Sequence, residues 1–208
     1  MFLVNGLAKL ESMDLATIEE IRQVKYRYLR CVDLKLWDEM ADVFTSDATV
    51  DYGTRAYGKP LKLAGRDEII AFFRTALGPE IITVHAAGQP EITVDGDTAS
   101  GTWRFQDTVI ATEHRVVIAG AAFYQDRYER GADGAWRIAH TGYVRTYEAM
   151  MSLDDLPSFK FLAGPPKGAA ADAAPSTTGP STAAPSTTAP STTAPSTTGT
   201  SVADTAVR

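Results

Sequence analysis

Residues 25–52 read KYRYLRCVDLKLWDEMADVFTSDATVDY, and this stretch organises the rest of the chain. Its apolar residues recur at helical spacing up to Val32, and again from Trp37 to Phe44. The pattern predicts two consecutive helices over residues 17–32 and 36–44. A set of polar side chains lies inside this apolar pattern: Tyr26, Tyr28, Asp33, Asp51 and Tyr52.

Asp33 falls where the first helix is expected to end. An acid at this position has two ordinary interpretations, because it can cap the following helix or lie in solvent. A third interpretation is a carboxylate directed into a pocket, where it would need a basic partner from elsewhere in the chain. The local pattern leaves all three open.

The remaining pattern predicts a short strand over 48–52, a loop over 53–65 and a helix over 66–77. After Pro79 the period changes to two, which predicts strands over 81–87, 91–94, 98–110, 115–130 and 135–147. The turns at 95–97 and 131–134 join neighbouring strands as hairpins. Helices followed by long strands indicate an α+β fold, a cone-shaped curved antiparallel β-sheet with the N-terminal helices packed on its concave face. Such a sheet has a pocket at its mouth.

Composition divides the 208 residues into a lead-in (1–13), one domain (14–163) and a tail (164–208) rich in Ala, Pro, Ser and Thr. The tail has no residues for a core, so we expect disorder there. The net charge of −6 and the absence of a basic stripe argue against nucleic-acid binding. No apolar run approaches the roughly 18 residues of a membrane span, so the sequence predicts a cytoplasmic protein without a membrane partner. The single cysteine, Cys31, excludes an internal disulfide and is expected in the core.

The chain has three histidines. His114 lies in a polar turn and is expected in solvent, and His140 reads as a structural histidine in the last strand. His85 has small or apolar neighbours, so either a structural or a functional role is open. No HxH or HxxxH spacing supports a metal site, and no glycine-rich strand–helix turn supports a nucleotide site. The sequence therefore predicts a site without metal or cofactor.

The chain resembles a SnoaL-like domain of the nuclear-transport-factor-2-like superfamily, which has a cone fold. The resemblance covers about residues 14–150 and rests on Tyr28 with Asp33 five residues later, the pair Asp51-Tyr52, and two segments. These segments are TVHAAGQPEI, which contains His85, and YVRTY, which contains Arg145. The similar branch contains scytalone dehydratase, bile-acid 7α-dehydratase and hexachlorocyclohexane dehydrochlorinase. A second histidine of scytalone dehydratase has no evident match, since Thr108 and Ile110 occupy that region.

The resemblance implies a catalytic dyad in which His85 is the base and Asp33 its orienting carboxylate. It implies that Tyr28, Tyr52 and Arg145 contact substrate. The implied reaction is a cofactor-free lyase reaction, a dehydratase-type elimination from a hydroxylated polycyclic or steroid-like ketone. The alternatives are an isomerase or cyclase in the same pocket, and a non-catalytic binding protein or one like an oxygenase β subunit.

Assembly is also expected, because no predicted helix covers the convex side of the sheet. Related dehydratases are trimers, so a homotrimer is the prediction. The apolar residues of segment 148–161 fit either an interface or a lid over the pocket.

Overall fold

The computed structural model describes residues 2–56 and 58–164, and within residues 2–14 it describes the backbone alone. The elements are, in chain order, α1 (Phe2–Leu34), α2 (Trp37–Ala41), β1 (Phe44–Gly53), β2 (Leu61–Ala64), α3 (Arg66–Ala76), β3 (Ile81–Asp95), β4 (Thr98–Ala111), β5 (Val116–Arg130), β6 (Trp136–Ser152) and the short 3₁₀ helix η1 (Leu153–Asp155). The predicted α+β class is confirmed.

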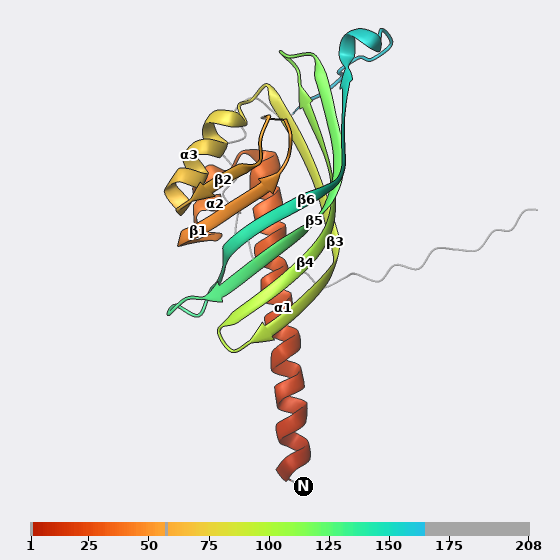
Figure 1. Ribbon diagram of the computed structural model, residues 1–208. Helices are drawn as coiled ribbons and strands as arrows, with labels where there is room; N and C mark the ends of the chain where they lie inside the picture. Colours follow the sequence, from red (N-terminus) through yellow and green to blue (C-terminus); the bar gives the residue numbers. More distant parts are fainter. Residues whose placement is uncertain (1, 57, 165–208) are drawn as a thin grey trace, which may run out of the picture. The chain divides into compact units, whose positions relative to one another are not determined.

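The six strands form one curved sheet in the order β2-β1-β6-β5-β4-β3 (Figure 1). Four of the five pairings are antiparallel, while β1 pairs in parallel with β6. The register shifts in β3 between Gly88 and Glu91, and at two places between β5 and β6. Such irregularities bend strands, so they contribute to the curvature that forms a concave face.

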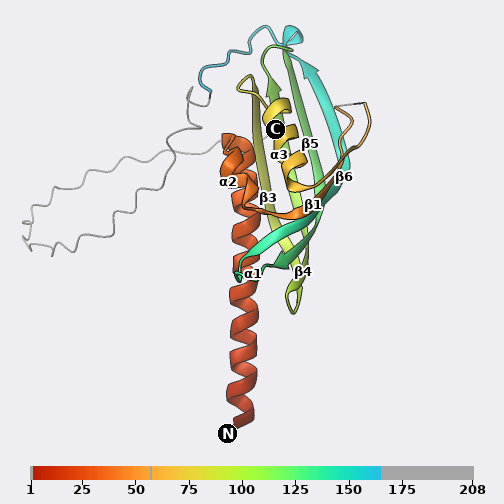
Figure 2. The same cartoon turned by 90° about the vertical axis from the view of Figure 1, so that its left-hand side faces the viewer.

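The helices cover this concave face. The C-terminal half of α1 contacts β3 and β6, whereas α3 contacts β1 and β2. Figure 2 shows α3 lying against the sheet, with α2 beside α1. Trp37 of α2 stacks on Phe73 of α3, with ring centroids 6.2 Å apart. The predicted placement of the helices is therefore confirmed, and the space enclosed between helices and sheet is where a site can form.

The core joins the inner face of α1 to the sheet. Its largest fully buried apolar side chains include Trp103, Tyr124, Tyr128, Phe44 and Phe105. Cys31 is fully buried in this core, as expected, and burial raises the pKa of its thiol to about 11. The thiol therefore stays protonated and acts as a small apolar residue.

Several element boundaries differ from the prediction. Helix α1 begins at Phe2 rather than near Asp14, so the lead-in is helical and Asp14 is not its N-cap. The segment around Leu7 to Met13 is rich in good helix formers, and that propensity outweighed the capping signal. Helix α2 ends at Ala41, because Phe44 already begins β1, whose inward positions Phe44, Ala48 and Val50 are buried.

Two further differences concern strands. The loop predicted over 53–65 contains β2, a strand of four residues between turns. The two strands predicted over 81–87 and 91–94 form one continuous β3. Along the part of the chain that the structure describes, no helix is long and apolar enough to cross a membrane. The tail for which disorder is expected, residues 164–208, lies outside the described residues except for Gly164.

Candidate active site

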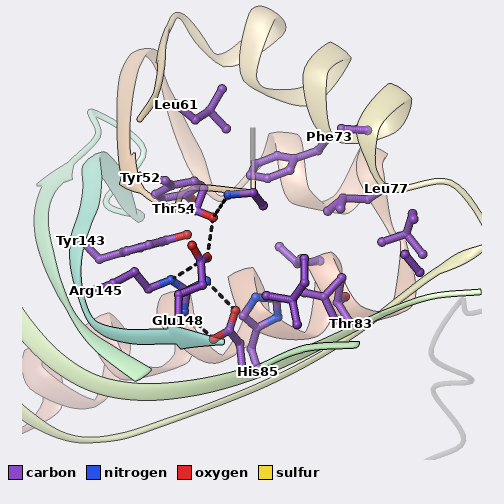
Figure 3. A pocket seen from close by; sticks show the side chains of 18 of the residues that line it. Tyr52, Thr54, Leu61, Phe73, Leu77, Thr83, His85, Tyr143, Arg145 and Glu148 are labelled. Carbon is purple, nitrogen blue, oxygen red and sulfur yellow. Dashed lines mark hydrogen bonds and ion pairs between the residues drawn. The ribbon is translucent and has the colours of Figure 1, made fainter. Parts of the chain in front are cut away.

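A cavity of about 390 Å³ lies between the sheet and the helices α1 and α3. Its wall is mainly apolar and aromatic, with contributions from Val32, Phe72, Phe73, Leu77 and Val109. Figure 3 shows Tyr143, Arg145, Glu148, His85 and Thr83 along the sheet side of this space, with Leu61, Phe73 and Leu77 across from them. The cavity therefore combines an apolar wall with several polar side chains, which is typical of small-molecule sites.

The end of α1 places Asp33 beside the sheet. The N–H of Leu36 donates to the carbonyl of Cys31 at 2.9 Å, and Lys35 adopts a left-handed φ of 63°. This is a Schellman-type helix end, with a lysine where glycine is usual. Asp33 thus lies in the last helical turn, where the helix dipole disfavours a negative charge. The carboxylate needs hydrogen-bond donors from outside the helix.

Three donors from β3 meet the Asp33 carboxylate. His85 Nδ1 lies 2.7 Å from Oδ1, the His85 backbone N–H donates to Oδ2 at 2.9 Å, and the Thr83 hydroxyl donates to Oδ1 at 2.9 Å. An ionised carboxylate can only accept, so Nδ1 carries the proton of a neutral His85 and Nε2 keeps its lone pair. His85 lines the cavity, whereas Asp33 lies behind it. The pair therefore has the geometry of a base held by a carboxylate.

Lys35 extends this network away from the cavity. Its Nζ donates to the Thr83 hydroxyl at 3.1 Å, which leaves the hydroxyl hydrogen for Asp33. Burial lowers the pKa of Lys35 to about 8, although the charges of Asp33 and Glu80 partly oppose this shift. The sequence analysis assigned no role to Lys35 or Thr83. The alternation of β3, which points Thr83 and His85 to the same face, is the signal that could have identified Thr83.

Tyrosines form a second polar group at the cavity. The hydroxyls of Tyr28 and Tyr52 are hydrogen-bonded to each other, and both side chains are buried. Tyr143 stacks on Tyr52 at 4.8 Å between ring centroids, and Tyr124 lies edge-on to Tyr28 at 6.2 Å. Burial raises the pKa of Tyr28, Tyr52 and Tyr124 well above the usual value. These phenols therefore stay protonated at neutral pH and can donate hydrogen bonds.

A buried ion pair between Lys25 and Asp126 packs against the tyrosines. Lys25 Nζ lies 2.8 Å from Asp126 Oδ2, with both side chains fully buried, and 3.3 Å from the centroid of the Tyr124 ring. Burial lowers the pKa of Lys25, and the partner Asp126 opposes that shift. The Tyr128 hydroxyl also donates to Asp126 at 2.7 Å. Removing one partner would leave an uncompensated buried charge, which is strongly destabilising. Because the pair contacts the Tyr124 ring and the Tyr128 hydroxyl, it helps to position these tyrosines.

Arg145 forms the centre of a third polar group. Its guanidinium binds Asp107 through two nitrogens, at 2.5 and 2.8 Å, and its Nε lies 3.3 Å from Glu148 Oε1. Glu148 also accepts from the Thr54 hydroxyl at 2.6 Å and from the Arg55 backbone N–H at 2.8 Å. Burial lowers the pKa of Arg145, but the bonds to Asp107 and the surrounding negative charges raise it more, so the net shift is upward. Sequence analysis missed both carboxylates.

The other two histidines lie apart from this arrangement. His114 is exposed in the turn between β4 and β5, as expected, where it contributes to the cavity rim. His140 Nδ1 is hydrogen-bonded to Thr49 Oγ1 at 2.8 Å on the opposite face of the sheet, as expected of a structural histidine. On β4, Asp107 and Val109 face the cavity, so strand alternation turns Thr108 and Ile110 away from it.

The five predicted site residues thus divide into those at the cavity and one behind it. His85, Tyr28, Tyr52 and Arg145 line the cavity, and Asp33 supports His85 from behind. Two other members of the polar set lie elsewhere: Tyr26 is exposed and packs on Trp103, while Asp51 pairs with Lys62. Within the described part of the chain, no three His, Cys, Asp or Glu side chains are grouped so that they could hold a metal ion.

The fold and the cavity together define a class of α+β proteins in which a curved sheet and its helices enclose a small-molecule site. The chain belongs to the family of SnoaL-like domains, whose model matches residues 13–142. An uncharacterized protein of Mycobacterium tuberculosis (strain H37Rv) is 33% identical over 134 residues, which cover 64% of this chain and 87% of that protein. The predicted family is therefore confirmed.

Solved structures show the same fold in enzymes of the lyase type. The hexachlorocyclohexane dehydrochlorinase LinA-type3 of Novosphingobium barchaimii is 19% identical with a TM-score of 0.59, and the match covers 72% of this chain and 97% of that chain. A candidate scytalone dehydratase of Novosphingobium aromaticivorans is 18% identical with a TM-score of 0.59, over 76% of this chain and 97% of that chain. At these identities the likeness concerns the fold.

Proposed function

We propose that this protein is a cofactor-independent lyase that removes water from a hydroxylated polycyclic or steroid-like ketone, with His85 and Asp33 as its dyad. The observation that carries the proposal is the position of His85, whose ring reaches an apolar cavity while Nδ1 is bound to a carboxylate behind it. A neutral imidazole held in this way is suited to accept a proton from carbon near neutral pH.

The proposed reaction begins when Nε2 of His85 takes a proton from the carbon next to the substrate carbonyl. The electron pair of that C–H bond forms a C=C bond as the C–O bond of the β-hydroxyl breaks. The departing hydroxyl takes the proton that His85 Nε2 now holds and leaves as water, so the reaction returns His85 to its neutral form. Asp33 stabilises the transient imidazolium without itself taking the proton.

Tyr28 and Tyr52 are the proposed hydrogen-bond donors to substrate oxygen. Their high pKa keeps them protonated, so one of the paired hydroxyls can donate to a carbonyl oxygen that becomes enolate-like or to the departing hydroxyl. Because the cavity wall is largely aromatic and its volume of about 390 Å³ falls in the range of small-molecule sites, a ring system with few polar groups is the proposed substrate.

An isomerase or cyclase is the second candidate. The hydrogen-bonded Tyr28–Tyr52 pair favours it, because a stabilised enolate can be reprotonated at another carbon without loss of a leaving group. The two reactions differ in their product, since isomerisation leaves the mass unchanged. A non-catalytic binding protein would bind the ligand and form no product.

A substrate screen tests the proposal. The full chain is incubated with a panel of hydroxysteroids and polycyclic ketols, and products are followed by mass spectrometry. We expect a product that has lost one water with at least one ketol, and no such product with His85→Ala. Turnover that survives in His85→Ala, or binding of ketols without any turnover, would contradict the proposal. A product of unchanged mass would identify the isomerase.

A further inference from the structure

Arg145 is the one lysine or arginine among the described residues that line the cavity, so it is the natural candidate to bind an anionic group of a substrate. Its contacts argue against that role. Each of its three guanidinium nitrogens lies within 3.3 Å of a carboxylate oxygen of Asp107 or Glu148, and the side chain is 10% exposed. The positive charge of Arg145 is therefore already paired with carboxylates of the protein.

The backbone is built to hold Arg145 in this position. Gly120 of β5 pairs with Asp107 on β4 and with Glu148 on β6, so these three positions form one row across the sheet. A Cβ at Gly120 would lie 2.6 Å from Arg145 Nη1 and 3.1 Å from its Cζ. The guanidinium thus crosses β5 through the space that the missing side chain leaves, and it reaches Asp107 on β4.

The row carries more negative than positive charge. Asp107 and Glu148 contribute two carboxylates to one guanidinium, so the formal charge of the group is −1. Two lysines next to the cavity are each matched with an acid, since Lys25 contacts Asp126 and Lys35 reaches Asp33 through Thr83. Among the described residues that line the cavity, an anion therefore meets no lysine or arginine other than the paired Arg145, while it loses its hydration and meets excess negative charge.

We infer that Asp107, Glu148 and Gly120 are specificity determinants that make the cavity select charge-neutral ligands over carboxylates of the same shape. This inference rests on the proposed function only where it takes the bound ligand to be the substrate. The charge preference itself is a property of binding and does not require turnover. Glu148 contributes through its position as well, since Thr54 and Arg55 fix both of its oxygens. The substrate class is thereby narrowed to neutral ring systems without a carboxylate or phosphate inside the cavity.

The test uses two ligands that differ in charge but share a ring system, 2-naphthoate and methyl 2-naphthoate. Their affinities for the full chain are measured by displacement of the neutral fluorophore N-phenyl-1-naphthylamine, which confines the readout to one site. We expect the wild type to bind the ester at least about tenfold more tightly than the anion. In Glu148→Gln, which removes the excess charge, we expect the anion to gain roughly tenfold while the ester changes by less than about twofold, since tenfold corresponds to about 1.4 kcal/mol.

Asp107→Asn provides a second variant with the same expected direction, and Asp38→Asn is the control. Asp38 is almost fully exposed and pairs with Arg74 at the surface, so its loss changes the net charge equally without touching the cavity. Melting curves show whether each variant folds. Equal affinities of the wild type for ester and anion, or an unchanged ratio in both folded cavity variants, would overturn the inference. Neither ligand is a ketol substrate, so a failed turnover screen leaves this test standing.

Discussion

The cavity has an Arg145 end and a His85 end, which meet at the β3–β4 register partners His85 and Asp107, and these two ends differ in what they leave unpaired. At the Arg145 end, two guanidinium nitrogens donate to Asp107, Nε lies 3.3 Å from Glu148 Oε1 without a hydrogen bond, and Glu148 is fixed by two further donors. At the His85 end, Nδ1 is bound to Asp33, whereas no described side chain pairs with Nε2. Charge alone therefore does not mark a reactive group. The reactive, open end is the His85 end, where one oriented atom, Nε2, has no partner among the described side chains. The closed end is the Arg145 end, whose charges are paired and which affects only the ligands that can bind.

The largest expected effect is at the open end. His85→Ala removes the proposed base, and general-base loss typically lowers turnover by about 10²–10⁴-fold. Asp33→Asn should be comparably severe, because an amide cannot stabilise an imidazolium in the same way. We expect the double variant to be little worse than either single one, since the residues act as a unit. Additive losses in kcat/KM would show that the two residues act separately.

The closed end is tested by Gly120→Ala. The added Cβ would lie 2.6 Å from Arg145 Nη1, so the guanidinium must leave Asp107 or the strand must shift. We expect a loss of about 1–3 kcal/mol in the free energy of unfolding, the usual cost of overpacking. Gly88→Ala is the matched control, since a Cβ there meets nothing within 4 Å. Equal denaturant midpoints for both variants would contradict the crossing of Arg145 over β5.

A smaller effect is expected from Thr83→Val, which keeps the shape of the side chain but removes the donor to Asp33 and the acceptor for Lys35. Asp33 retains both bonds from His85, so we expect turnover to fall by about tenfold, the scale of one lost hydrogen bond to a charged group. Thr75→Val, at an exposed position of α3, serves as the control. Unchanged kcat in Thr83→Val would remove Thr83 from the supporting network.

The smallest effect concerns pH. The folded-state pKa of Lys35 is about 8, below its ordinary 10.5, so the folded protein releases this proton first as pH rises. Between these values the unfolded chain binds more protons, and stability therefore increases with pH. We expect the wild type to gain stability relative to Lys35→Met between pH 8 and 10.5, as measured by urea unfolding. A flat difference would show that Lys35 titrates normally.

Much of the fold could be predicted from the sequence, because the periodicity of apolar residues and the glycine and proline signals at element ends are local features. The change to period two after Pro79 predicted the long strands, and Gly78-Pro79 marked the end of α3 within two residues. The parallel pairing of β1 with β6 could not be predicted, since it joins strands far apart in the chain. The β2 strand was missed because four residues between glycines and a proline carry little signal.

The site was predicted only in part, because some of its contacts depend on the register of distant strands. His85 and Asp33 were identified through family resemblance, whereas Asp107 and Glu148 were missed because their pairing with Arg145 depends on register and on the empty space at Gly120. Lys25 was missed because its partner Asp126 lies a hundred residues away. The cytoplasmic location and the homotrimer stay predictions. Exposed Phe123 and Val144, which pair on neighbouring strands, support an interface that sedimentation can test.

The most direct test of the His85–Asp33 dyad is the tautomer of His85, observed by long-range ¹H–¹⁵N NMR on the full chain. With only three histidines, His114→Gln and His140→Gln variants complete the assignment. We expect neutral His85 to carry its proton on Nδ1, bound to Asp33, and Nε2 to be unprotonated toward the cavity. A neutral His85 protonated on Nε2 would have no lone pair for the substrate, and this result would contradict the dyad.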